Sequence, residues 1–263
     1  MRLTTPINLQ HTLDSGQIFR YHQEGDGYRI LHGCDAFFVR TDGRQLRFDG
    51  IAQGRLARFF RLDDPYVTII NRLRRDTLLR GALQQYHGLR LLRQDPWECM
   101  ISFLCSSATN IPRIKRDLGM IAKTFGREKG GFFLFPRIGE IDSLAKLKKC
   151  GTGFRAEYIN AVNRTVTKAF FRKLTRLAYE DSKEALMELP GIGPKVADCI
   201  LLFSLEKLNA FPIDTWTERA LREHYVRKPK ATHRELQAFA QRHFAPYAGY
   251  AQQFLYHWRR SKI

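Results

Sequence analysis

The chain has 263 residues, of which 44% are hydrophobic and 12% aromatic; this is enough apolar surface for a sizeable core and excludes an intrinsically disordered protein. Lysine and arginine number 44 against 26 aspartates and glutamates, and the net charge of +18 at pH 7 favours a polyanionic partner, nucleic acid before a membrane surface. The five cysteines, at positions 34, 99, 105, 150 and 199, never form a Cys-x-x-Cys pair, which excludes the clustered thiolates of zinc and iron–sulfur sites and favours reduced thiols inside a cell.

The first 50 residues are typical of a small antiparallel sheet. Short runs of β-branched and aromatic residues cover 28–32 and 36–40, and residues 45–48 alternate polar with apolar side chains. Glycines between these runs indicate turns. The N-terminal residues lack the apolar core of a signal peptide, and no later apolar run approaches the roughly 20 residues that cross a membrane. We therefore expect an intracellular protein that is not inserted in a membrane.

Helical spacing of apolar residues begins near residue 55 and continues toward the end of the chain. Asp95 and Pro96 are favoured as the N-cap and first residue of a helix, and they predict a helix over 97–107. Further helices are expected over 112–125, 142–148, 155–169, 182–188, 194–205, 215–224, 232–243 and 247–259. The sequence thus predicts an α+β fold with two domains. A β-rich domain over 1–85, with helices near its end, precedes a helical body over 86–263.

The most informative segment is Leu-Pro-Gly-Ile-Gly-Pro-Lys, which ends at Lys195. Gly191 and Gly193 allow a tight turn with unobstructed N–H groups, and Pro194 is a favoured first residue for the helix that follows. Because the start of a helix attracts anions, the segment predicts a hairpin that binds a DNA phosphate without reading the base sequence. An ordinary corner between two helices is the alternative for these few residues alone.

The longer run over 189–198 (LPGIGPKVAD) resembles the helix–hairpin–helix motif of DNA-repair glycosylases, and the resemblance implies that Lys195 is the nucleophile of a bifunctional member. A primary amine can displace a base at C1′ and form a Schiff base with the opened sugar. The first turn of a helix, where the dipole opposes positive charge, favours the neutral and reactive form of the amine. A solvated lysine that only contacts phosphate is the alternative.

Asp214 lies one helix further along the chain, in the run Ile-Asp-Thr-Trp, and is predicted to be the N-cap of the helix over 215–224. The resemblance implies a second role for it, since members of the superfamily carry their catalytic aspartate at this position. A fixed carboxylate stabilises the positive charge that develops at C1′ and the ring oxygen during glycosidic cleavage, and it can assist proton movement around Lys195. Capping alone is the alternative.

Other segments narrow the resemblance to 8-oxoguanine DNA glycosylase/AP lyase. Residues 15–20 (SGQIFR) resemble the N-terminal signature of that family, 92–107 its first core helix, and 151–156 (GTGFRA) its wedge loop. The similarity spans about residues 12–257. It implies excision of 8-oxoguanine from duplex DNA through a lysine Schiff base, followed by strand cleavage by β-elimination, in base excision repair. It also implies that the protein is a monomer.

The resemblance assigns roles around the lesion as well. The Gly16 carbonyl would accept a hydrogen bond from N7–H of the oxidised purine, at the position where normal guanine has a lone pair. Gln252 would meet the Watson–Crick edge, and Tyr256 and Cys199 would lie on the two faces of the flipped base. The alternatives are purely structural roles: a turn glycine, an aromatic residue on a helix face and a small core residue.

On the opposite strand, the resemblance implies that Phe154 fills the gap left by the flipped base and that Arg113 and Arg155 hydrogen-bond the orphaned base. Two residues depart from the family. Ala108 replaces the asparagine that helps to read the opposite cytosine, and Trp216 stands where eukaryotic members often have a histidine. Both departures leave the selectivity for the opposite base open, and neither changes the residues expected to carry the lysine chemistry.

Two other functions stay open. One is a monofunctional alkyl-purine glycosylase of the same superfamily, which the lysine at position 195 disfavours. The other is a non-catalytic DNA-binding module, which the aspartate at position 214 and the wedge loop disfavour. The resemblance implies no cofactor, zinc or iron–sulfur cluster, and it allows a monovalent cation at the hairpin when DNA is bound. The compact length indicates a bacterial or archaeal member, located in the cytoplasm or nucleoid.

Overall fold

The computed structural model describes residues 1–226, 228 and 230–261. Its N-terminal part contains a four-stranded antiparallel sheet of order β1-β2-β3-β4. The strands are Tyr21–Glu24, Gly27–His32, Asp35–Asp42 and Gln45–Asp49. Side chains alternate along β2 and β3, so that Ile30, Phe37 and Val39 are fully buried on one face. The predicted antiparallel sheet is confirmed. β1 is an additional strand that its polar sequence did not indicate.

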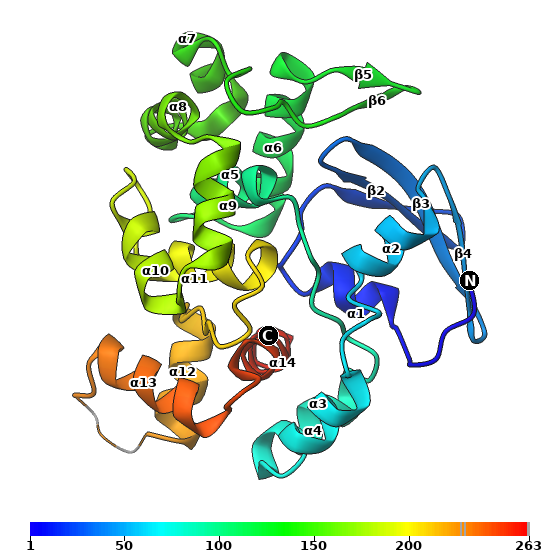
Figure 1. Ribbon diagram of the computed structural model, residues 1–263, viewed down its shortest axis with the longest axis vertical. Coiled ribbons are helices and arrows are strands. Elements are labelled where there is room, and N and C mark those ends of the chain that lie inside the picture. The colour runs from blue at the N-terminus through cyan, green and yellow to red at the C-terminus, as the bar shows by residue number, and fades with distance from the viewer. Residues whose placement is uncertain (227, 229, 262–263) are drawn as a thin grey trace.

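One face of this sheet packs on two short helices, α1 (Leu9–Asp14) and α2 (Gln53–Phe59), and the three elements enclose the smaller of two cores (Figure 1). Its fully buried members include Leu13 from α1 and Leu56 from α2. The turn that follows α1 leaves this core and reaches the helical body. This turn brings the first predicted site residue, Gly16, to the candidate site.

The larger core surrounds two central helices, α5 (Pro96–Cys105) and α11 (Pro194–Ser204), which pack against each other. Asp95 caps α5 by accepting hydrogen bonds from the first backbone N–H groups, as predicted, and every residue from Trp97 to Cys105 is buried. The surrounding helices are α3 (Tyr66–Leu73), α4 (Thr77–Gln85), α6 (Ile111–Phe125), α7 (Leu144–Leu147), α8 (Arg155–Thr165), α9 (Lys168–Arg176), α10 (Tyr179–Met187), α12 (Thr215–His224), α13 (His233–His243) and α14 (Ala248–Arg260). The predicted α+β fold with a helical body is confirmed.

Two predicted helices differ from the structure, and one short hairpin was not predicted. The helix expected over 155–169 ends at Thr165, because Val166 and Thr167 are extended and Thr167 caps the separate helix α9. The helix expected over 142–148 is the short α7, which continues into a π-helical turn, Lys148–Thr152. Two strands of two residues each, β5 (Glu128–Lys129) and β6 (Phe132–Phe133), form a hairpin too short for its alternation to be recognised.

The two cores interleave along the chain. Phe19 belongs to the larger core although it precedes the sheet, and Leu92 belongs to the smaller core although it follows α4. The buried residues of α3 and α4 also belong to the larger core. The division into domains at residue 85 therefore stays a proposal about folding units.

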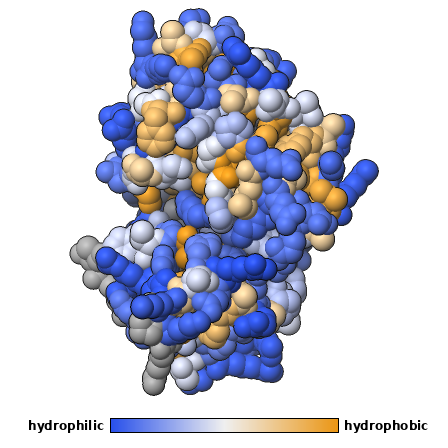
Figure 2. Space-filling view, turned by 90° about the vertical axis from the view of Figure 1, so that its left-hand side faces the viewer, coloured by the Kyte–Doolittle hydropathy of each residue, from blue (hydrophilic) through white to orange (hydrophobic). Residues whose placement is uncertain are grey.

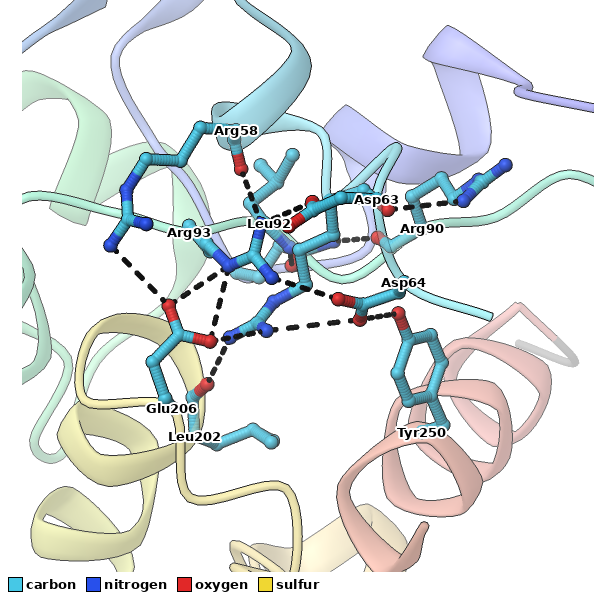
Figure 3. A network of polar contacts seen from close by, with 11 residues as sticks. Arg58, Asp63, Asp64, Arg90, Leu92, Arg93, Leu202, Glu206 and Tyr250 are labelled. Carbon is cyan, nitrogen blue, oxygen red and sulfur yellow. Dashed lines mark hydrogen bonds and ion pairs between the residues drawn. The ribbon is translucent and has the colours of Figure 1, made fainter. Parts of the chain in front are cut away.

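A network of ion pairs joins the N-terminal part to the helical body (Figure 3). Glu206, which follows α11, accepts hydrogen bonds from Arg61 at 2.7 Å and Arg93 at 3.1 Å, and Arg93 also pairs with Asp64 at 2.9 Å. Asp64 in turn accepts a hydrogen bond from Tyr250 on α14 at 2.6 Å. Arg61 and Glu206 both adopt left-handed backbone conformations, with φ of 48° and 62°. The network thus fixes the start of α14, which carries part of the candidate site.

The hydropathy of the surface varies from region to region. Figure 2 shows a largely hydrophilic face on which the hydrophobic side chains gather mainly in the upper half. Among the described residues, no helix combines the length and the hydropathy that a membrane span requires.

A buried histidine on α14 makes stability depend on pH. The His257 ring lies 4.4 Å from the Tyr86 ring and 5.6 Å from the His11 ring, centroid to centroid. Burial, assisted by the charge of Arg260, lowers the pKa of His257 from 6.5 to about 4. The neutral ring therefore contributes stability that is complete above pH 6.5 and is lost as the pH falls toward 4.

We accordingly expect the free energy of unfolding of the wild type to fall, between pH 7 and pH 4, by about 2 kcal/mol more than that of His257→Phe. Urea unfolding at a series of pH values measures this difference. His22→Phe is the matched control, because the side chain of His22 is 53% exposed. Parallel pH dependences for wild type and His257→Phe would show that His257 does not titrate in this way.

Candidate active site

A cavity of about 920 Å³ lies where α5, α11, the start of α12 and α14 meet. It is lined by seven of the residues that the sequence singled out: Gly16, Ala108, Lys195, Cys199, Asp214, Gln252 and Tyr256. These residues come from distant parts of the chain, and the fold brings them to one concave surface. The other five (Arg113, Phe154, Arg155, Gly191 and Gly193) do not line it. The described residues contain no group of three or more histidine, cysteine, aspartate or glutamate side chains that could hold a metal ion.

Lys195 is the second residue of α11, and its amine reaches across the cavity to the end of α5. The Nζ atom lies 3.0 Å from Ser106 Oγ and 5.1 Å from the centroid of the Phe103 ring. One helical turn further along α11, Cys199 is buried beneath it. Burial raises the pKa of Cys199 to about 12, although the neighbouring charge of Lys195 opposes the rise. The thiol is therefore neutral, and the amine of Lys195 stays the candidate nucleophile of this cavity.

Asp214 is the N-cap of α12, as predicted. Its Oδ1 accepts hydrogen bonds from the backbone N–H and the hydroxyl of Thr217, both at 2.8 Å, and Thr217 Oγ1 completes a capping box by accepting the Asp214 N–H. All hydrogen bonds described for the carboxylate go to Oδ1, and the residue lines the cavity. Capping therefore fixes the carboxylate and leaves its second oxygen for a ligand.

The turn at Gly16 packs against α14. Its φ of 75° is in the left-handed region, and a Cβ atom there would lie 2.8 Å from the hydroxyl of Tyr256, so only glycine fits without strain. The preceding carbonyl, of Ser15, accepts a hydrogen bond from Gln253 at 2.7 Å. The backbone of this turn is thus held in a single position at the edge of the cavity.

Gln252 is the polar side chain at this end of the cavity. It is 4% exposed, and its Oε1 has no hydrogen-bond partner among the described residues. An unsatisfied buried acceptor costs about 1–3 kcal/mol, which a ligand that donates a hydrogen bond would recover. The cavity is therefore suited to a ligand that donates a hydrogen bond to Gln252.

The wedge loop lies beside the cavity. Phe154 is 57% exposed, and its ring lies 4.7 Å from the Arg155 guanidinium. Its entry into a base stack stays a prediction. Arg155 itself is buried and donates to the carbonyls of Ser107 and Ala108. Arg113 is largely exposed and donates to the Gly151 carbonyl at 3.0 Å. The reading of an opposite base by either arginine stays a prediction, and in this state Arg155 holds the loop over 106–110.

The hairpin has the predicted glycine turn, and its two glycines differ in backbone conformation and in the space around them. Gly191 has a φ of 79°, and a Cβ there would collide with the ring of Tyr158. Gly193, by contrast, is the N-cap of α11 with a φ of −91°, and the space around it is open. A side chain is excluded at Gly191 by the fold, whereas at Gly193 its absence leaves room for an anion to approach the helix start.

Beneath the hairpin, a buried ion pair ties α10 to α11. Asp198 is fully buried and accepts hydrogen bonds from Tyr179 at 2.6 Å and Lys183 at 2.8 Å. Burial raises the pKa of Asp198 to about 6, against the pull of the Lys183 charge. The two helices of the hairpin are thus held in a fixed relative position.

Three residues of the site were not singled out from the sequence. Phe103 and Ser106 contact the amine of Lys195, and Gln253 holds the turn at Gly16. Ser106 stands in a pair of serines after α5, but no sequence pattern indicates which of the two faces the lysine. The register of α5 against α11, which is a tertiary property, decides it.

Comparisons with known proteins agree with this geometry. Residues 2–100 match the family model "8-oxoguanine DNA glycosylase, N-terminal domain", and residues 178–203 match the helix–hairpin–helix motif. A probable N-glycosylase/DNA lyase of Methanothermobacter thermautotrophicus is 34% identical over 216 residues, which are 72% of this chain and 69% of that protein. The N-glycosylase/DNA lyase OGG1 of Arabidopsis thaliana is 35% identical over 197 residues, which are 67% of this chain and 53% of that protein.

A solved structure is similar over almost the whole chain. It is the 8-oxoguanine glycosylase/lyase of Clostridium acetobutylicum in complex with double-stranded DNA containing cytosine opposite to 8-oxoguanine. The two chains are 30% identical and superpose with a TM-score of 0.92, which covers 98% of this chain and 93% of the other.

Proposed function

Because this chain belongs to the family of 8-oxoguanine DNA glycosylase/lyases, we propose that it excises 8-oxoguanine from duplex DNA and cleaves the strand at the same site. The observation that carries the proposal is the single cavity shared by Lys195, Asp214, Gly16 and Gln252. It holds a nucleophile, a fixed carboxylate and hydrogen-bond acceptors for a purine edge. The substrate is duplex DNA with an oxidised purine, and the protein acts as a monomer on chromosomal DNA.

Excision and strand cleavage follow from one covalent intermediate. The Lys195 nitrogen bonds to C1′ as the C1′–N9 bond breaks, and the base leaves with the bonding electrons and takes up a proton. The nitrogen then gives up one proton, and its electron pair breaks the C1′–O4′ bond. The ring oxygen takes up a proton as the sugar opens, which leaves a protonated imine. Loss of a C2′ proton then expels the 3′ phosphate, and water hydrolyses the imine to free the lysine. Asp214 stabilises the positive charge at C1′ and the ring oxygen.

Lesion recognition rests on hydrogen-bond acceptors. 8-Oxoguanine carries a hydrogen on N7, which the Gly16 carbonyl accepts, whereas guanine would place a lone pair against that carbonyl. The Watson–Crick edge of either base carries N1–H and N2–H donors, and these satisfy Gln252 Oε1. Tyr256 and Cys199 enclose the two faces of the base. Specificity for the lesion thus comes from the cost of an unpaired carbonyl, on the order of 1–3 kcal/mol.

The DNA is held outside the cavity. The N–H groups near Gly191 and Gly193 bind a phosphate at the start of α11, where a monovalent cation can assist once DNA is bound. Phe154 fills the gap in the stack, and Arg113 and Arg155 approach the orphaned base, the latter after it releases the loop carbonyls.

A panel of lesion duplexes tests the proposed function. Single-turnover excision is measured on duplexes that contain 8-oxoguanine, 7-methylguanine or 3-methyladenine at one position, and on the undamaged duplex. We expect excision with strand cleavage on 8-oxoguanine alone. Faster release of an alkylated purine, without strand cleavage, would favour the monofunctional alkyl-purine glycosylase. Binding of all four duplexes without excision would favour a non-catalytic module.

Selectivity for the opposite base should be weak. Ala108 cannot hydrogen-bond a base through its side chain, and its φ of 48° is unfavourable for alanine but tolerated by asparagine and glycine. We expect Ala108→Asn to raise the preference for cytosine over adenine opposite the lesion by about 2- to 13-fold, the equivalent of one polar contact. Single-turnover rates with each of the four opposite bases measure this preference.

Ala108→Gly is the matched control for this substitution. It relieves the same backbone strain without adding a polar side chain, so it should raise the unfolding temperature and leave the cytosine preference unchanged. An equal gain in preference from glycine and asparagine would mean that loop conformation, rather than a hydrogen bond, sets the selectivity. A wild type that already rejects every base except cytosine would contradict the prediction.

A further inference from the structure

Ser106, the residue after α5, accepts a hydrogen bond from the amine of Lys195, which also lies beside the thiol of Cys199. The Nζ–Oγ distance is 3.0 Å, and Ser106 Oγ also lies 2.7 Å from the Phe103 carbonyl. A carbonyl can only accept, so the single hydroxyl hydrogen points at Phe103. The lone pairs of Oγ therefore face Lys195, and the lysine is the donor in this contact.

The position of Ser106 is fixed from both sides. On one side, its backbone N–H donates to the Phe103 carbonyl in the last turn of α5. On the other side, the next two carbonyls, of Ser107 and Ala108, accept hydrogen bonds from the buried guanidinium of Arg155. The left-handed backbone of Ala108 is held by the same contacts. Ser106 is thus a rigid acceptor beside a flexible side chain.

Rigidity matters because a lysine has four rotatable bonds and three equivalent donors. A free side chain of this kind carries up to about 2 kcal/mol of rotamer entropy, and its amine samples many positions. When one N–H donates to Ser106, the lone pair of the neutral amine is confined to directions away from α5. Ser106, Asp214 and Gln252 line the same cavity as Lys195, so an amine held by Ser106 stays at that cavity.

We propose that Ser106 is the positioning residue for Lys195: it accepts one N–H so that the lone pair of the amine points at the position of C1′. This inference rests on the function proposed above. It separates the roles of the two adjacent serines, because the hydrogen bonds described for Ser107 involve its backbone N–H and carbonyl. Ser106 acts through the lysine and does not contact the reacting carbon.

The experiment compares Ser106→Ala and Ser107→Ala with the wild type in single-turnover excision of 8-oxoguanine over a range of enzyme concentrations. Loss of one hydrogen bond to a charged or reacting group predicts an excision rate about 10-fold lower for Ser106→Ala, or more if the amine is displaced. The enzyme concentration for half-maximal rate should stay unchanged, because duplex contacts are intact. Ser107→Ala should match the wild type in both quantities.

Two further variants remove the ambiguity of a folding defect. Ser106→Thr keeps the hydroxyl and should recover most of the rate, whereas Ser106→Cys is similar in size but a weak acceptor and should stay slow. If Ser106 had a structural role alone, the excision rates of the four variants would instead follow their unfolding temperatures.

Rates of Ser106→Ala and Ser106→Cys equal to that of Ser107→Ala would overturn the inference while leaving the proposed function intact, provided that the wild type excises the lesion. Failure of the wild type itself to form a covalent complex with lesion DNA in the presence of borohydride would instead contradict the proposed function. The two failures are therefore distinguishable.

Discussion

Replacing Lys195 with glutamine is expected to lower base excision and strand cleavage by at least about 1000-fold while lesion-duplex affinity changes little. Glutamine has a similar length but no nucleophilic amine. The phosphate contacts proposed above involve the backbone of the hairpin, which the substitution leaves in place. Single-turnover excision, strand cleavage on a denaturing gel and duplex binding by fluorescence anisotropy measure the three quantities.

Lys207→Gln is the matched control for this substitution. The amine of Lys207 donates to the carbonyls of Thr175 and Leu177, and the residue does not line the cavity. The Lys207→Gln variant should therefore excise the lesion at the same rate as the wild type. Normal strand cleavage by pure Lys195→Gln protein would show that another group is the nucleophile.

Asp214→Asn is expected to lower the excision rate by about 100-fold and to leave the unfolding temperature close to that of the wild type. Asparagine is as good an N-cap as aspartate, and its Oδ1 can accept the same hydrogen bonds from Thr217. It lacks the negative charge that stabilises the developing positive charge at C1′. This substitution therefore separates catalysis from capping, which the sequence alone left open.

Asp214→Ala provides the comparison, because it removes both the charge and the cap. It should lose a similar amount of activity and, in addition, about 1 kcal/mol of stability. Calorimetry and single-turnover kinetics on both variants give the two quantities. Full activity in Asp214→Asn with a loss only in Asp214→Ala would reduce Asp214 to a helix cap.

The features that could be predicted from the sequence are those set by neighbouring residues. The turn at Gly191, the start of α11 at Pro194 and the cap at Asp214 each depend on a few adjacent residues, and all three were predicted. The strands around Ile30 and Val39 were predicted for the same reason, because runs of β-branched and aromatic residues between glycines are visible within a few residues.

The features that could not be predicted depend on packing between distant segments. The ion pair of Arg61 with Glu206 joins residues 145 positions apart, and no local pattern indicates it. Similarly, whether Ser106 or Ser107 faces Lys195 depends on the register of α5 against α11. Arg155 was identified as a residue of the wedge loop, but its burial under the carbonyls of the neighbouring loop is a tertiary property.

The central claim is that Lys195 is the nucleophile of a lesion-specific glycosylase, and borohydride trapping tests it most directly. The wild type is incubated with an 8-oxoguanine duplex and borohydride, and the covalent complex is digested and analysed by mass spectrometry. We expect a reduced sugar adduct on the peptide that contains Lys195 and no adduct with undamaged duplex. An adduct on a different residue, or excision of 8-oxoguanine with no covalent complex at all, would contradict it.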